Sequence, residues 1–166
     1  MRLAYKAIVV LFLPISVGAQ TSPDFTGHWR QQANSKTQRQ LEVAQTGGNL
    51  RVKTLVTNSD GTRSLEVNYV IGGPETTYTG LDGDEFHSSV RWDAGRLIFD
   101  IIEHEGSNEI PQKTVWTLSV DGTTLQVDRQ FTKSGKTTHS LSTYLRQNAL
   151  RRVACDKPRL ERKCAQ

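Results

Sequence analysis

The sequence predicts an all-β protein, an antiparallel up-and-down β-barrel of about 8–10 strands with a short C-terminal extension that could be helical. Three observations favour this fold class. Turn signals recur along the chain, apolar and polar residues alternate between them, and no long segment has the apolar period of a helix. The missing helices disfavour parallel α/β folds, which need helical crossovers. Because a closed barrel leaves no unpaired strand edge, we favour it over a sandwich, which stays the alternative.

The turn signals divide residues 39–147 into short segments. Asp-Gly and Gly-Gly pairs supply the positive φ angles that tight hairpins require. They recur roughly every 10–14 residues, a spacing typical of barrels and sandwiches. The signals lie at 46–49, 59–62, 72–74, 81–84, 93–95, 121–122 and 134–135.

The first strand is expected at residues 25–30, Phe-Thr-Gly-His-Trp-Arg. Trp29 can bury a large apolar ring, and Gly27 lets the backbone turn sharply or pass close to another strand. In a meander that closes on itself, this strand pairs with the last one, at 137–147. Arg146 could then lie across the Trp29 ring, a contact worth about 0.5–2 kcal/mol. Gly27, Trp29 and Arg146 are therefore predicted to close the barrel.

The Gly27-x-Trp29 motif, the hairpins that follow and the Arg on the final strand resemble the calycin superfamily of lipocalins and fatty-acid-binding proteins. The chain is most similar to secreted bacterial lipocalin-like domains. The resemblance covers residues 25–147 as architecture and only a few residues as motif. It implies a barrel that binds a small molecule in its interior.

Alternation predicts the strands between these two ends. Every second residue is apolar while its neighbours are mostly polar, as expected for a sheet with one buried and one wet face. The residues expected to share the buried face are Leu41 and Val43; Leu50, Val52, Thr54 and Val56; Leu65, Val67, Tyr69 and Ile71; Leu97, Phe99 and Ile101; Trp116, Leu118 and Val120; and Leu125, Val127, Arg129 and Phe131.

Two polar segments interrupt the alternation. Residues 33–38 are expected to form a loop between the first two strands. Residues 104–112 are expected to form the longest turn of the later half of the chain. Such loops could frame the mouth of a barrel.

The N-terminal residues 1–19 are expected to be a secretory signal peptide. Arg2 and Lys6 precede an apolar run at 7–13, and small residues at 17–19 suit a cleavage site. The apolar run is too short to span a bilayer. We therefore expect a protein exported to a bacterial periplasm or the extracellular space.

The domain organisation that follows is a signal peptide at 1–19, a lipocalin-like barrel at 20–147 and a basic tail at 148–166. Cys155 and Cys164 are expected to form a disulfide, since an even, closely spaced pair in an exported chain favours one. From Arg146 onward the chain has seven basic and two acidic side chains. This tail is either a solvated appendage or a contact for an anionic envelope surface. It contains no aromatic residue for stacking on bases, so we expect no nucleic-acid partner.

No catalytic constellation is visible. A Gly-x-Ser-x-Gly nucleophile motif and a phosphate-binding glycine loop are both absent. His87, His104, Glu103 and Glu105 could be taken for metal ligands, but exposed polar residues at a strand end explain them better. We expect no enzyme, no metal and no cofactor.

The best functional candidate is Arg129, a charge on an apolar strand face, because a buried Arg is costly unless it is paired. The resemblance implies that Arg129, with Tyr144 or Arg146, contacts a ligand carboxylate. The family pattern on the last strand is Arg-x-Tyr, whereas this chain has Tyr144-Leu-Arg146. If Tyr144 and Arg146 face inward, Leu141 and Leu145 face outward. The alternative is that Arg129 has a structural role, at a barrel end or beside an acid.

These observations predict a monomeric, exported barrel that binds an apolar or amphipathic small molecule. The expected ligand-contacting side chains are Tyr69, Phe99, Trp116, Arg129 and Tyr144. The alternative is a filled barrel without a cavity that acts by contact with a protein or the cell envelope. Interior volume distinguishes the two.

Overall fold

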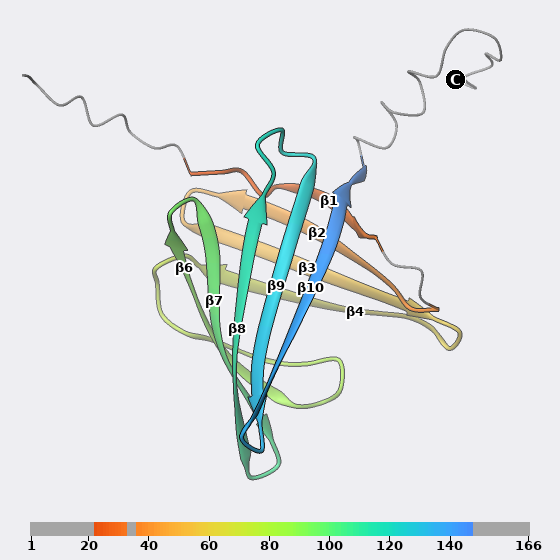
Figure 1. The fold of residues 1–166 in the computed structure, drawn as a ribbon, viewed down its shortest axis with the longest axis vertical. Helices are drawn as coiled ribbons and strands as arrows, with labels where there is room; N and C mark the ends of the chain where they lie inside the picture. The colour runs from red at the N-terminus through yellow and green to blue at the C-terminus, as the bar shows by residue number, and fades with distance from the viewer. Residues whose placement is uncertain (1–21, 33–35, 148–166) are drawn as a thin grey trace, which may run out of the picture.

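The computed structural model describes residues 22–32 and 36–147. They form one antiparallel sheet that curls into a nearly closed barrel (Figure 1), which confirms the predicted fold class and strand number. The strands are β1 Gly27–Gln31, β2 Gln38–Thr46, β3 Asn49–Asn58, β4 Gly61–Val70, β5 Thr76–Thr79, β6 Glu85–Asp93, β7 Arg96–Glu105, β8 Asn108–Leu118, β9 Thr124–Lys133 and β10 Lys136–Arg146.

The strand order is β4-β3-β2-β1-β10-β9-β8-β7-β6-β5. All pairs of adjacent strands but one are therefore consecutive in the chain. The exception is β1 beside β10, the pairing predicted from the two chain ends. Strands β2–β4 cross the long strands β7–β10 at a steep angle in Figure 1. The barrel thus consists of two curved halves that meet where β1 lies against β10.

The two halves also approach each other at a seam between β4 and β5, where no strand ladder joins them. A single bridge pairs Ile71 with Val90, and the Gly72 amide donates to the Val90 carbonyl at 2.6 Å. The barrel is therefore closed by backbone bonds at one end of the seam, and side-chain bonds from Arg63 to the Leu81 carbonyl and from Thr76 to the Asn68 carbonyl cross the rest of it.

The buried face of the sheet forms the core. Alternate residues point inward, as the sequence pattern predicts, because apolar side chains leave water on that face. The buried core residues are Phe25, Trp29, Leu41, Val43, Leu50, Val52, Val67, Tyr69, Val90, Leu97, Phe99, Trp116, Leu125 and Tyr144.

The parity of the last strand is settled by its register. Trp29 lies opposite Arg146 and Gln31 opposite Tyr144 across the β1–β10 ladder, so these four side chains share the inner face. Leu141 is correspondingly exposed. Because alternate side chains of a strand point to opposite faces, Leu141 faces outward when Tyr144 and Arg146 face inward.

Two sequence-based expectations were wrong. Residues 104–112 do not form a long turn, since β7 continues to Glu105 and β8 begins at Asn108. Gly106, with φ +62°, makes the turn almost alone, and the polar residues after it alternate with buried Ile110 and Gln112. Val120 is fully exposed, because β8 ends at Leu118 and the chain has already turned.

The expected signal peptide, the tail at 148–166 and the cysteine pair lie outside the described residues. Within the described residues, no helix has the length and hydropathy needed to cross a membrane.

Candidate functional site

One end of the barrel is filled by aromatic side chains. Phe25, just before β1, and Trp29 are both fully buried. The Trp29 indole Nε1 donates to the Phe25 carbonyl at 3.0 Å, and the Phe25 ring lies 6.1 Å from the Trp116 ring. These buried rings form an aromatic plug at that end of the barrel.

Arg146 covers the plug from the last strand. Its guanidinium lies 4.5 Å from the centre of the Trp29 ring and donates to the Thr26 carbonyl at 2.9 Å. Gly27 has φ +152°, and a Cβ there would lie 3.6 Å from the Arg146 guanidinium. The structure thus brings Gly27, Trp29 and Arg146 together, and the Arg146 guanidinium bonds to the backbone carbonyls of the segment before β1.

Beyond the plug the barrel contains a cavity of about 400 Å³. Trp116 and Tyr144 line it, together with aliphatic side chains and three arginines. Its apolar lining is Leu41, Val56, Leu65, Leu81, Phe86, Ile101 and Val127, and its charged lining is Arg39, Arg63, Arg129 and Asp82. The interior is therefore only partly filled, and its lining is amphipathic.

A second, more polar pocket of about 300 Å³ adjoins this cavity. The two pockets share four lining residues: Arg39, Val127, Arg129 and Tyr144. The polar pocket adds three side chains of its own: Gln31, Ser140 and Ser142.

Arg129 is held by a polar chain across three strands. Its Nε and Nη2 donate to Oε1 of Gln112 at 2.9 and 2.5 Å, and the Gln112 amide donates to the Glu103 carboxylate. Gln112 is buried, so its full hydrogen bonding removes a large penalty. The sequence analysis considered a structural role for Arg129 beside an acid. The structure shows an indirect form of it, since Gln112 links Arg129 to Glu103.

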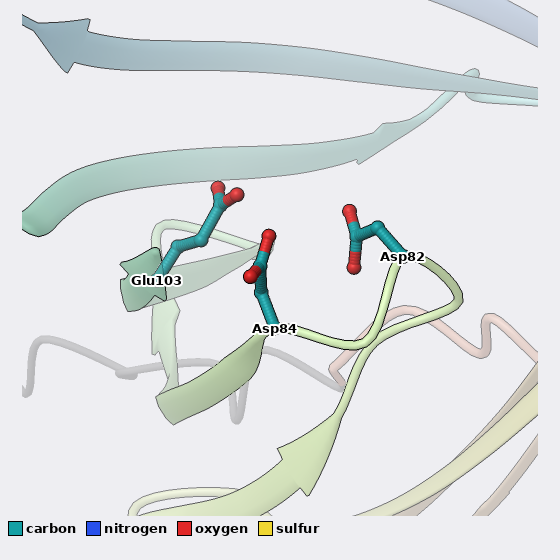
Figure 2. Close-up of side chains that lie close together, drawn as sticks. All are labelled: Asp82, Asp84 and Glu103. Carbon is teal, nitrogen blue, oxygen red and sulfur yellow. The ribbon is translucent and has the colours of Figure 1, made fainter. Parts of the chain in front are cut away.

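Three carboxylates meet beside this chain. Asp82 and Asp84, from the loop between β5 and β6, point toward Glu103 of β7, as Figure 2 shows, with oxygens within 4.8 Å of one another. Burial raises the pKa of Glu103, and the two aspartates raise it further, while Arg129 opposes them.

Replacing Glu103 by glutamine tests this raised pKa. A carboxyl with a raised pKa binds its proton more tightly in the folded state, so folding stability falls as the pH rises from the ordinary value of 4.5 through the raised pKa. Glu103→Gln removes that loss and keeps an acceptor for Gln112. We expect its stability relative to wild type to increase with pH across this window and then to level off.

Urea unfolding between about pH 4 and pH 8 measures the effect. Glu109→Gln, an exposed carboxylate on β8, is the matched control. A gain with the same pH dependence in both variants would contradict a specific role of Glu103.

The structure separates the five predicted ligand contacts into two groups. Trp116, Arg129 and Tyr144 line the cavity. Tyr69 and Phe99 instead pack against each other in the core, with ring centres 5.5 Å apart. Burial is the main cause that raises the pKa of the Tyr69 hydroxyl.

The histidines lie away from the cavity. The His87 ring bonds Glu75 and Glu85 at 2.8 and 2.9 Å and lies 4.8 Å from the His104 ring. These two carboxylates raise the pKa of His87, with Glu85 contributing most. The cluster joins the segment before β5 to β6.

Sequence reasoning missed Arg39, Arg63 and Gln112. Arg39 and Arg63 both lie opposite Val56 in the ladders of β2, β3 and β4, so all three share one face. The alternation at 50–56 places Val56 on the inner face. Residues paired with Val56 on the two neighbouring strands share that face, and this signal identifies both arginines.

Comparison with known proteins supports the fold. No protein-family model matches the chain, and no curated protein is similar to it in sequence. Two solved structures, a REP1-NXSQ fatty acid transporter and lipid binding protein 8 of Caenorhabditis elegans, match with TM-scores of 0.57 and 0.58 at 14% and 12% identity, over 74% of this chain and 95% of each of theirs.

A third similar structure is secretory abundant heat soluble protein 4 of Ramazzottius varieornatus, with a TM-score of 0.54 and 17% identity over 74% of this chain and 94% of that protein. Identities this low show the fold and nothing finer. This chain has the calycin fold.

Proposed function

We propose that this protein binds a small, at least partly apolar molecule inside its barrel and is not an enzyme. The observation that carries the proposal is the cavity of about 400 Å³, which is lined by apolar side chains, by Trp116 and Tyr144 and by charged groups. Ligand pockets typically enclose about 300–1,000 Å³ and combine an apolar lining with a few placed polar groups. The similar solved structures include a fatty acid transporter and a lipid binding protein, which fits this reading.

Export is part of the proposal and rests on the sequence alone. The apolar run at 7–13 with its basic residues before it and small residues after it has the form of a signal peptide. A barrel released outside the cytoplasm could carry an apolar molecule through water, which is the use that the cavity suggests.

Native mass spectrometry of the mature protein, with and without added hexadecanoic acid, hexadecanol or retinol, tests the proposal. We expect one bound molecule for at least one member of this panel, or a co-purifying mass of a few hundred daltons. A protein that binds none of them and carries nothing would favour the alternative of a barrel that acts through its surface.

A cavity-filling substitution tests the location. Val127 lines both the cavity and the polar pocket, so the indole of Val127→Trp would occupy the shared space. We expect affinity for the ligand found above to fall at least about tenfold, while overpacking lowers stability by about 1–3 kcal/mol.

Gln126→Trp is the matched control, because Gln126 is the exposed neighbour on the same strand. It should bind as wild type does. Equal binding by both variants would place the ligand outside the barrel.

A further inference from the structure

Two histidines and a carboxylate are neighbours on the outer face of β6 and β7. The side chain of Glu103 bonds buried Gln112, so His104, the next residue of β7, points to the opposite face. Glu85 is the direct partner of His104 across the ladder, and His87 lies two residues beyond Glu85 on β6. Side chains at three such positions lie close together on one face of a sheet.

The spacing of the two imidazole rings suits a shared metal ion. Their centres lie 4.8 Å apart, at an angle of 64°. Two imidazoles on one tetrahedral Zn²⁺ have ring centres about 5 Å apart, since each Zn–N bond is about 2.0–2.1 Å. Within the described part of the chain, His104 forms no hydrogen bond. Its ring can therefore turn about the Cβ–Cγ bond and direct a nitrogen toward His87, which completes the site.

His87 and Glu85 already lie at nearly the separation of two metal ligands. Nε2 of His87 is 2.9 Å from Oε1 of Glu85. Two donor atoms on one tetrahedral Zn²⁺ are about 3.3 Å apart. Both side chains are partly exposed, 30% for His87 and 60% for Glu85, so they can separate by this small amount. A metal ion would take the place of the proton between the two atoms and release it to water.

The other nitrogen of His87 is held by a second carboxylate. Nδ1 lies 2.8 Å from Oε1 of Glu75, in the segment just before β5. A metal-binding histidine commonly donates its other ring N–H to a carboxylate, which fixes the tautomer and the orientation of the ring. With Glu75 on Nδ1, the nitrogen left for a metal ion is Nε2, the one that faces Glu85.

The charge around the two rings also favours a cation. Glu109 of β8 lies opposite His104 on the side away from Glu85, so the histidine stands between two carboxylates. Across the residues that the structure describes, no Lys or Arg forms an ion pair with Glu75, Glu85 or Glu109. Carboxylates without a basic partner leave a negative potential that attracts cations.

We propose that His87, His104 and Glu85 bind a divalent transition-metal ion such as Zn²⁺, with water as the fourth ligand. Two imidazoles, a carboxylate and water are an established donor set for Zn²⁺, and imidazole also suits Cu²⁺ and Ni²⁺. Glu75 is a positioning residue that orients His87. The site is independent of the proposed function, because it lies on the outer face of the barrel and not in the cavity.

The proposal revises the sequence-based interpretation of these histidines. The sequence placed them beside Glu103 and Glu105, the neighbours of His104 in the chain. The structure instead bonds Glu103 to Gln112 and pairs Glu105 with Lys133. The carboxylates that meet the two rings come from β6 and from the segment before β5, and only strand pairing brings them there.

Isothermal titration calorimetry with ZnCl₂ tests the site on the untagged full chain at about pH 8, where imidazole is mostly neutral. We expect one ion per chain with a micromolar Kd. His104→Gln should weaken binding at least about tenfold, because it removes a ligand. Glu75→Gln should cost about tenfold, the effect of losing an orienting carboxylate. His104→Gln should leave the urea midpoint without metal unchanged, since His104 forms no hydrogen bond to lose.

Two controls distinguish this site from other metal-binding groups. His139→Gln removes an exposed histidine of β10 and should bind Zn²⁺ as wild type does. Cys155→Ser with Cys164→Ser should also bind as wild type does, because a pair of thiolates is the competing site for this ion.

Absence of Zn²⁺ binding by wild type would overturn the proposal. Equal affinity in wild type and His104→Gln, or binding that disappears with the two cysteines, would overturn it as well. None of these results bears on the cavity, which the ligand panel above tests separately.

Discussion

Trp29→Ala is expected to lower the free energy of unfolding by about 3–5 kcal/mol. Trp29 is fully buried, donates its indole N–H to the Phe25 carbonyl at 3.0 Å and carries the Arg146 guanidinium on its face. Truncation removes the ring, leaves the Phe25 carbonyl without its donor and exposes a guanidinium to a void. Each of these changes destabilises the same end of the barrel.

Urea unfolding followed by far-UV circular dichroism measures this change, because the variant loses a fluorescent ring. His28→Ala is the matched control, since His28 is the exposed neighbour on β1 and should cost under about 0.5 kcal/mol. A loss under about 1 kcal/mol for Trp29→Ala would show that the plug does not hold the barrel together.

Phe25→Ala is also expected to lower the free energy of unfolding by about 3–5 kcal/mol, although Phe25 lies outside every strand. Its ring is fully buried between Trp92 and Trp116, at centroid distances of 6.0 and 6.1 Å. Residues just before the first strand of a domain are seldom this important, because the ends of most domains are poorly ordered unless they are tied down. Here the Phe25 amide donates to the Gln45 side chain at 3.2 Å.

The same unfolding experiment applies, with Ser22→Ala, an exposed position three residues earlier, as control. Stability equal to that of the control would show that the segment before β1 is peripheral. The double variant with Trp29→Ala should lose less than the sum of the two single losses, because each substitution already breaks the contact between the two residues.

The sequence allowed the fold to be predicted in some detail. Alternation from Leu50 to Val56 and from Leu125 to Phe131 was sufficient, because one buried face imposes a period of two whatever the neighbouring strands are. The polar start of β8 was mistaken for part of a long turn after Glu105. A polar strand looks like a loop in the sequence, because only its pairing with a neighbouring strand distinguishes the two. The short β5 had no such alternation, and only its pairing with β6 makes it a strand.

The site was harder to predict than the fold. Arg129 stood out because a charge interrupts an apolar row within its own strand. Arg39 did not, since its position in the pocket depends on where β1 ends and on the register of two ladders. Tyr69 and Phe99 have the same chemistry as Trp116, and only packing decides which ring faces the cavity.

The pairing of β1 with β10 has a consequence for the order of folding. Gln31 and Tyr144 stand at opposite ends of the described chain, yet they are partners in one ladder. Contacts between residues so far apart carry the largest loop-closure entropy and slow the folding of β-proteins. The hairpins from β2 to β9 can form as their residues emerge during synthesis, but closure must wait for the final strand. Until then the chain has two unpaired strand edges and an uncovered apolar face, so the last strand to be made is the one that shields both.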